Sequence, residues 1–203
     1  MLKRIEIITL ILLQSIACMS QTYSDSIAGF RENYLQDFLR EERSPIHDKE
    51  NLKYIQFFDA DSSYRVTASF MKTENASPFE MQTLNGKTKT YVEYGSISFS
   101  LGGRPFVLKI YQSISLRTNP EYKNHLFLPF NDDTNGDESY AAGRYIDLSI
   151  SDIVDGNVEI DFNKAYNPYC AYSAGYSCPK PPDENYLPIE VRAGEKKYAK
   201  ESH

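Results

Sequence analysis

The chain has no tryptophan, and its 203 residues include only three histidines and three cysteines. His47, His125 and His203 are scattered along the sequence, and none stands at the spacing of a zinc motif, so we expect no metal site. A glycine-rich phosphate loop and a G-x-S-x-G nucleophile elbow are both absent from the sequence. Nucleotide hydrolysis and the α/β-hydrolase mechanism therefore have no support, and we expect no cofactor.

Positive charge is also scarce in this sequence. There are 22 lysines and arginines against 28 acidic residues, which gives a net charge of −6. A protein that binds nucleic acid needs a basic stripe with interleaved aromatic residues, and no stretch of the chain has one. We therefore expect no nucleic-acid partner. The sequence leaves the oligomeric state open.

Long hydrophobic runs are missing as well. The longest, within residues 7–13, is far shorter than the roughly twenty apolar residues that a membrane helix requires. Lys3 and Arg4 precede this run, and small residues follow it up to Ser20. This order is typical of an export signal at residues 1–20 and favours a periplasmic or secreted protein.

The cysteines fit an exported chain. Removal of residues 1–20 would leave residues 21–203, a length that suits one domain, although a lipoprotein anchored through Cys18 is an alternative. Cys170 and Cys178 are then the cysteines left to the folded domain. In a short, proline-rich loop of an exported protein, the pair favours a disulfide over a metal site or a nucleophile. Two free, packed thiols are the alternative.

Hydrophobic periodicity predicts one helix followed by strands. Apolar residues recur at three- and four-residue intervals over residues 26–42, as in an amphipathic helix, and Ser44-Pro45 ends the pattern. Beyond this point the period changes to two. We predict strands at residues 64–70, 79–83, 91–101, 105–111, 125–130, 144–149, 158–162 and 187–192.

Turn residues separate these strands. Asn85-Gly86, Gly102-Gly103 and Asp155-Gly156-Asn157 are all strong turn signals. The sequence thus predicts a mainly β fold, a single antiparallel β domain of about eight or nine strands with one N-terminal amphipathic helix, arranged as a barrel or a sandwich. We expect the charged segment 195–203 to fray.

Polar residues that suit a site gather in residues 132–147. Asp132 and Glu138 are acidic, Tyr140 supplies a hydroxyl, and the planar guanidinium of Arg144 can hold an anion at two points. An internal ion pair that ties a loop to the sheet is the alternative interpretation of Arg144.

Strand alternation makes a separate prediction for the same stretch. It places Arg144 and Ile146 on one face of their strand, and Tyr145 and Asp147 on the other. A second polar stretch, residues 161–185, has no period and is rich in proline, so we predict an ordered loop.

Two stretches carry a family resemblance. LFLPFNDDTNGDESYAAGRYIDL and IDFNKAYNPYCAYSAGYSCPKPPDENYLPIEVRAGEK resemble the two signature blocks of the bacterial Domain of Unknown Function 1684 family. The similarity extends more weakly over nearly all of the chain beyond the predicted signal. It implies no reaction, ligand or partner, but it joins the two polar stretches as halves of one signature. Asn163, Asn167 and Asn185 in the second half are suited to satisfying buried backbone groups of irregular segments.

We expect a cleft between residues 132–147 and 161–185 that binds a small polar or anionic ligand or a component of the cell envelope. The candidate ligand-binding residues are Asp132, Glu138, Tyr140, Arg144, Asn163 and Asn167. One alternative is a hydrolase in which Glu138 works with Asp132 or Asp161 as an acid–base pair. Another is a purely structural or interaction protein of the envelope.

Overall fold

A computed structural model describes residues 22–200, so the predicted export signal and Cys18 lie outside the described residues. Residues 22–40 form the main helix. The strands are β1 (Arg65–Lys72), β2 (Phe79–Gln82), β3 (Thr88–Leu101), β4 (Arg104–Ser113), β5 (His125–Asp132), β6 (Arg144–Ser149), β7 (Asn157–Asp161) and β8 (Tyr186–Leu187). Short 3-10 helices are η1 (Lys49–Tyr54), η2 (Ser62–Tyr64), η3 (Leu116–Thr118), η4 (Ile150–Asp152), η5 (Phe162–Lys164), η6 (Tyr169–Ala171) and η7 (Asp183–Asn185).

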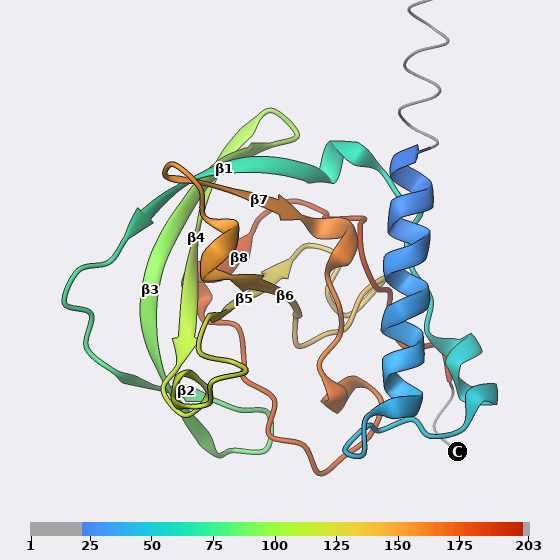
Figure 1. Ribbon diagram of the computed structural model, residues 1–203. Coiled ribbons are helices and arrows are strands. Elements are labelled where there is room, and N and C mark those ends of the chain that lie inside the picture. Colours follow the sequence, from blue (N-terminus) through green and yellow to red (C-terminus); the bar gives the residue numbers. More distant parts are fainter. Residues whose placement is uncertain (1–21, 201–203) are drawn as a thin grey trace, which may run out of the picture.

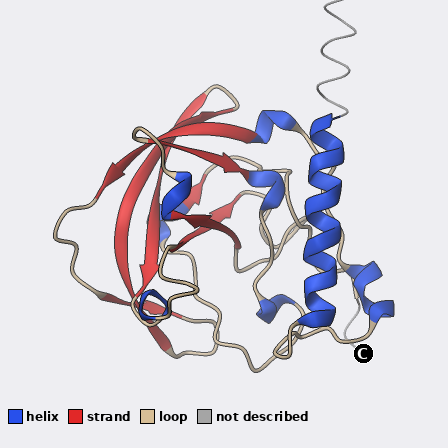
Figure 2. Ribbon diagram, in the orientation of Figure 1, coloured by secondary structure: helices blue, strands red, loops and turns tan. Residues whose placement is uncertain are grey.

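The strands form one curled sheet with the order β6-β5-β4-β3-β1-β7 (Figure 1). β2 extends the sheet beside β3, and all of these pairs are antiparallel. Only the short β8 runs parallel to its neighbour, β5. The predicted mainly antiparallel β domain with one N-terminal helix is confirmed, and the sheet curls into a half-barrel (Figure 2).

The last predicted strand, residues 187–192, was wrong beyond its first residue. β8 ends at Leu187, and Pro188 has no amide hydrogen with which to continue a ladder. The chain then crosses the open side of the half-barrel, where Val191 and Ala193 are fully buried in the main core. This segment closes the core without extending the sheet.

The two faces of the sheet bury different kinds of residue. On β5, Leu126, Leu128 and Phe130 face inward to the main core, whereas Phe127 faces outward. The outward residues form a second cluster, which consists of Met81, Tyr91, Tyr111, Phe127 and Tyr145, with Tyr166 packed against it. The predicted alternation on β6 is confirmed, because Ile146 belongs to the main core and Tyr145 to the outer cluster.

The N-terminal helix stands apart from the sheet, beside the start of β1 and the end of β7 (Figure 1). Ile27 and Phe38 from the predicted apolar stripe are buried, and Phe38 packs in a third cluster with residues of the segment that follows the helix. Phe30 from the same stripe is 36% exposed. No helix within residues 22–200 is both long and apolar enough to cross a membrane.

Asn185 fills a gap in the sheet. β4 and β5 share a single ladder pair, Tyr111 with Phe127, so their backbones diverge on either side of it. The Asn185 side chain accepts a hydrogen bond from the Lys109 amide at 2.7 Å and donates to the carbonyl oxygens of Lys109 and Pro129 at 2.8 and 2.7 Å. The predicted role of this asparagine in satisfying buried backbone groups is confirmed.

Candidate functional site

Arg144 lies at the centre of a fully buried network. Its side chain is 0% exposed, and one terminal nitrogen donates to Asp132 Oδ2 at 2.7 Å and to the Val191 carbonyl at 2.8 Å. The other terminal nitrogen donates to the carbonyls of Ala193 and Glu195. The guanidinium therefore binds alternate carbonyl groups of the C-terminal segment and one carboxylate of the sheet.

Asp132 has partners on both oxygens. While Oδ2 accepts from Arg144, Oδ1 accepts from the amide and the hydroxyl of Thr134 at 2.9 and 2.6 Å and from the Val191 amide at 3.2 Å. This is the internal ion pair that the sequence left as an alternative. Both terminal nitrogens of Arg144 are occupied by protein acceptors, so they are not available to hold a ligand in this arrangement.

Two glycines allow the chain to pass close to this network. Gly143 has φ +85°, and a Cβ there would lie 2.7 Å from the Phe130 carbonyl oxygen. Gly194 has φ +76°, and a Cβ there would lie 2.6 Å from the Ala165 carbonyl oxygen. Any other residue would strain the backbone and force these neighbours apart, which explains glycine next to Arg144 and between its acceptor carbonyls.

The other candidate residues also have internal roles. Glu138 pairs with Arg192 at 2.8 Å on the surface, and burial raises the pKa of the half-buried Tyr140. Asn163 is fully buried and donates to Tyr23 Oη at 2.8 Å and to a backbone carbonyl. Asn167 is fully buried and donates through its side chain to the Lys196 carbonyl at 2.8 Å. The sequence prediction that these asparagines satisfy irregular backbone is confirmed.

Glu195 is a buried carboxylate, and its oxygens take part in no ion pair within residues 22–200. It is 0% exposed and accepts hydrogen bonds from Tyr34 Oη at 3.0 Å, Tyr172 Oη at 2.6 Å and the Asn167 amide at 2.9 Å. Burial raises the pKa of Glu195 to about 7, and the three hydrogen bonds only partly oppose this. The predicted fraying of residues 195–203 was wrong for the described part of this tail, because the amides of Glu195, Lys196 and Ala199 donate to carbonyls of other segments, and residues 201–203 lie outside the described residues. Glu195 itself joins the helix to residues 167–172 of the ordered loop.

The predicted disulfide is confirmed. Cys170 and Cys178 are bonded, with their Cα atoms 6.2 Å apart. The loop that they close contacts both the helix end and the sheet. Tyr176 Oη donates to the carbonyl of Arg43, just after the helix, at 2.9 Å, and the Cys178 carbonyl accepts a hydrogen bond from the amide of Leu84, near β2. The disulfide loop, residues 168–179, thus spans the distance from the helix to the sheet.

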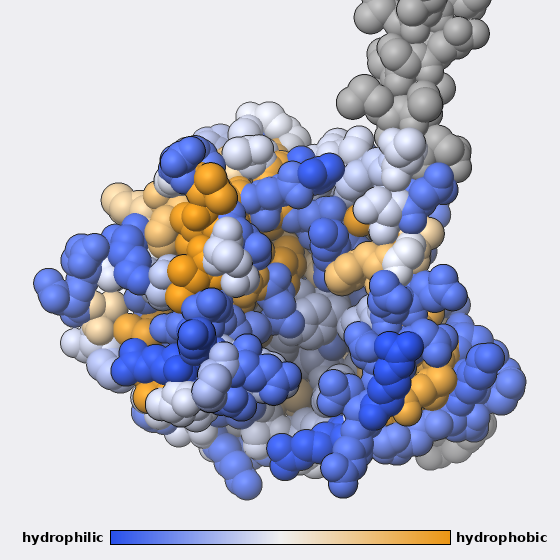
Figure 3. Space-filling model, viewed as in Figure 1, coloured by the Kyte–Doolittle hydropathy of each residue, from blue (hydrophilic) through white to orange (hydrophobic). Residues whose placement is uncertain are grey.

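A cleft of about 1350 Å³ lies between the helix, the outer face of the sheet and the disulfide loop. Figure 3 shows it as a hollow between the sheet and the helix. Its lining includes Phe30 and Tyr34 from the helix, Lys89 and Tyr91 from β3, His125 and Phe127 from β5, Tyr145 and Asp147 from β6, and Tyr166, Tyr169 and Tyr176 from the segment after β7. Pockets for drug-sized ligands measure roughly 300–1,000 Å³, so this open cleft has room for one.

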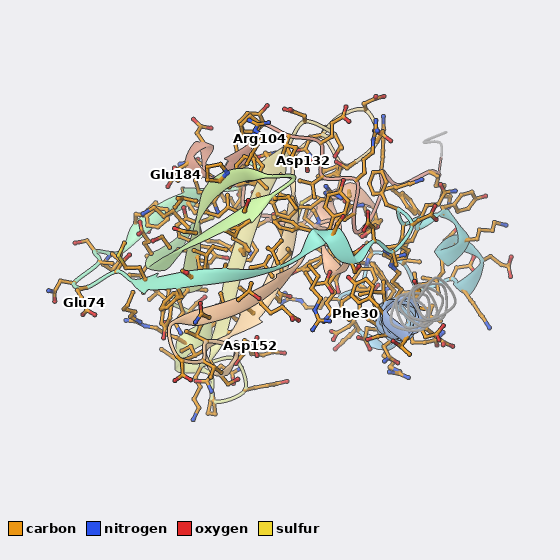
Figure 4. The ribbon with its side chains drawn as sticks, turned by 90° about the horizontal axis from the view of Figure 1, so that it is seen from above. Phe30, Glu74, Arg104, Asp132, Asp152 and Glu184 are labelled. Carbon is orange, nitrogen blue, oxygen red and sulfur yellow. A yellow bond between two sulfur atoms is a disulfide. The ribbon has the colours of Figure 1, made fainter. Side chains whose placement is uncertain are left out.

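None of the six candidate residues lines this cleft. Figure 4 places Phe30 and Asp152, which do line it, toward one side of the molecule and Asp132 toward the opposite side. The cleft nevertheless lies between the two polar stretches of the sequence, since Tyr145 and Asp147 belong to the first and Tyr166 and Tyr169 to the second. The stretches thus form the core network with one set of side chains and the cleft wall with another.

Aromatic rings continue along the floor of the cleft. Tyr91 stacks on Phe127 with ring centroids 5.6 Å apart, and Phe127 meets the edge of Tyr145 at 4.7 Å. Tyr145 contacts Tyr166 at 5.8 Å, and Tyr166 contacts Tyr34 of the helix at 6.0 Å. Tyr91 and Phe127 are nearly parallel, whereas the Phe127–Tyr145 and Tyr145–Tyr166 pairs meet edge to face, so the row offers apolar aromatic surface in more than one orientation.

Several polar groups accompany the rings. Asp147 accepts from Tyr166 Oη at 2.8 Å and contacts His125 Nε2 at 2.9 Å. Burial, and then the charge of Asp147, raise the pKa of Tyr91 to about 12, so this hydroxyl is a hydrogen-bond donor at neutral pH. Tyr91 is only 6% exposed, and its Oη has no hydrogen-bond partner among the described residues.

Sequence reasoning did not identify the cleft residues. The signal was present in the outward-facing positions of the strands, because Tyr91, Phe127 and Tyr145 occupy the face that a one-sided sheet would give to polar side chains. The described residues include no group of three or more His, Cys, Asp or Glu placed to hold a metal ion.

The comparisons with known proteins give the family but no activity. The family model described as "Protein of unknown function (DUF1684)" matches residues 50–196, and the chain belongs to this family. The resemblance is thereby confirmed, and the bacterial source stays a prediction. No curated protein matches the chain.

A solved structure has the same fold. It is the solution NMR structure of an uncharacterized protein from gene locus rrnAC0354 of Haloarcula marismortui, which is 34% identical with a TM-score of 0.64. The alignment covers 87% of this chain and 96% of that one.

Substitution of Arg144 by methionine should destabilise the protein by about 3–5 kcal/mol, because Asp132 would keep a buried, uncompensated charge. Urea unfolding measures the change. Arg65→Met is the matched control, since its pair with Glu159 is exposed and should contribute less than about 1 kcal/mol. Equal losses of unfolding free energy in the two variants would show that the buried network does not stabilise the fold.

Glu195→Gln should remove a decline in stability with rising pH. Between pH 4.5 and about 7 the unfolded chain loses the Glu195 proton and the folded protein retains it, so the wild type loses stability as pH rises through this window. Urea unfolding at intervals from pH 4.5 to 8 should give a flatter profile for the variant. Glu190→Gln, an exposed position on the same segment, is the control and should follow the wild type. Parallel profiles for wild type and Glu195→Gln would refute the prediction.

Proposed function

We propose that the protein binds a small polar molecule, or a polar group of an envelope component, in the cleft between the helix, the outer face of the sheet and the disulfide loop. Support comes from the size of the cleft and from its lining of aromatic rings with polar groups at their edges. Binding sites for small molecules commonly combine apolar and aromatic walls with a few placed polar groups.

One observation carries the proposal. Tyr91 Oη belongs to a side chain that is more than nine-tenths buried, it lines the cleft, and it has no partner among the described residues. The hydroxyl is not one of the fully buried polar atoms that lack a partner in residues 22–200, so its hydrogen-bonding capacity is open to the cleft. A polar ligand in the cleft would supply a partner for it.

A carboxylate-dependent hydrolase has less support. Of Asp132, Glu138 and Asp161, only Asp161 lines the cleft. Its carboxylate accepts from Tyr23 Oη at 2.9 Å and from the Asn163 amide at 3.0 Å, while Asp132 is occupied by Arg144. An acid–base pair must share one cleft, so the geometry favours binding over this chemistry.

The proposal also places the protein outside the cytoplasm, in the periplasm or the medium. The signal-like order of residues 1–20 supports export, and so does the disulfide, because such bonds persist in oxidising compartments. An anchor through Cys18 is the alternative form of the same proposal. In either form the cleft would be open to molecules of the envelope or the surroundings.

A cleft-blocking substitution tests the binding site. Asn33 is exposed on the helix and lines the cleft, so Asn33→Trp should place an indole in it without disturbing the core. A panel of polar metabolites should contain a compound that binds the wild type in ligand-observed NMR and binds Asn33→Trp at least tenfold more weakly.

Two controls belong to this experiment. Asn33→Ala empties the same position, and Glu32→Trp adds the same ring at an exposed position that does not line the cleft. Both should bind as the wild type does. If no compound binds, or if Asn33→Trp binds unchanged, a structural or interaction role of the domain is favoured instead.

A further inference from the structure

The charges that line the cleft are unequally paired. Most of its carboxylates are already held by protein donors: Asp37 by Arg40, Asp147 by Tyr166 and His125, Asp152 by the Ser149 amide, Glu159 by Arg65, and Asp161 by Tyr23 and Asn163. Among the lining carboxylates only Glu41 has no such donor within residues 22–200. The acidic side of the cleft is therefore largely satisfied by the fold.

The cations that line the cleft have no carboxylate partner. Arg43, Lys89 and Lys164 take part in none of the salt bridges found in residues 22–200. Lys164 Nζ lies 5.5 Å from the centroid of the Phe30 ring, which compensates part of its charge. Hydrogen bonds from neutral groups do not cancel the charge of Asp147, Asp152 and Asp161, so the lining as a whole stays acidic, and Arg43, Lys89 and Lys164 are the unpaired positive groups within it.

Within residues 22–200, Lys89 lacks even the aromatic contact that Lys164 has. Desolvation lowers the pKa of Lys89 below its ordinary value, and no hydrogen bond to its Nζ is present in the described part of the chain. Lys89 and Tyr91 stand two positions apart on β3 and both line the cleft, so they share one face of the strand. An unpaired ammonium thus lies beside an unpaired hydroxyl donor.

Apolar aromatic surface adjoins these two donors. Tyr91 stacks on Phe127, and Phe127 packs against Tyr145, so the floor beyond the donors is made of rings. The one carboxylate of this floor, Asp147, already accepts from Tyr166 and contacts His125. A ligand with an anionic group at one end and an apolar aromatic body would match the donors and the rings together.

We infer that the ligand of the cleft is a small organic anion, whose carboxylate or phosphate group binds Lys89 Nζ and Tyr91 Oη and whose apolar body packs against the Phe127 and Tyr145 rings. This inference rests on the proposed function, since it names the chemical class of ligand for the same cleft. A carboxylate and a phosphate ester present the same anionic oxygens to these donors.

A series of naphthalene probes that differ only in their head group tests the inference. The anionic probes are 2-naphthoate and 2-naphthyl phosphate, the uncharged one is 2-naphthalenemethanol, and the cationic one is protonated 2-naphthylmethylamine. Isothermal titration calorimetry at pH 7 should show at least tenfold tighter binding for an anionic probe than for the alcohol, and the weakest binding for the amine. The anionic probe that binds more tightly shows whether the cleft prefers a carboxylate or a phosphate head group.

Lysine variants assign the effect to one side chain. Lys89→Met should weaken binding of the anionic probes about tenfold and leave the alcohol unchanged, while Lys89→Arg should stay within threefold of the wild type. Lys87→Met is the matched control, because it removes the same charge from the same hairpin at an exposed position outside the cleft lining. Tyr91→Phe should weaken the anionic probes about threefold.

The outcomes separate this inference from the proposed function. If the alcohol binds as tightly as the anions, if the amine binds most tightly, or if Lys89→Met and Lys87→Met behave alike, the anionic class is wrong. In each case, loss of binding in Asn33→Trp would still support a ligand in the cleft. If no probe binds and a metabolite that Asn33→Trp rejects is uncharged, the inference falls and the proposed function stands.

Discussion

The fold depends on one buried cation. Arg144 is held by Asp132 and by three carbonyls of the C-terminal segment, and this segment closes the open side of the half-barrel. A charge buried this completely is tolerated only where it is paired and hydrogen-bonded, as both terminal nitrogens of Arg144 are. The network therefore fixes the path of the chain across the core, and the same path places Glu195 beneath the disulfide loop.

The cleft follows from this arrangement. Because the inner face of the sheet packs against the C-terminal segment, the outer face is left for other elements to cover. The helix and the disulfide loop cover it only in part, and the Glu195 carboxylate joins the two through Tyr34 and Tyr172. Core and cleft therefore use opposite faces of the same strands. For this reason the two polar stretches of the family signature contribute residues to both.

Much of the fold was readable from the sequence because its signals are local. The period-two strands, the turn at Gly102-Gly103 and the cysteine pair each depend on neighbouring residues. Burial of a charged side chain, in contrast, does not depend on neighbouring residues in the sequence. Nothing local in the sequence distinguishes a buried Arg144 or Glu195 from an exposed one. The cleft was equally hidden, since β3, β5 and β6 come from distant parts of the chain and only their pairing brings Lys89 and Tyr91 beside Phe127 and Tyr145.

One NMR titration can test whether the core network is structural and the cleft binds the ligand. Backbone amide NMR spectra of the 15N-labelled protein would be recorded with increasing 2-naphthoate. We expect the shift changes to concentrate at Lys89, Tyr91, Phe127 and Tyr145, with little change at Asp132 and Arg144. Changes centred on Asp132 and Arg144, with the cleft strands unaffected, would contradict the assignment of structure to one face of the sheet and binding to the other.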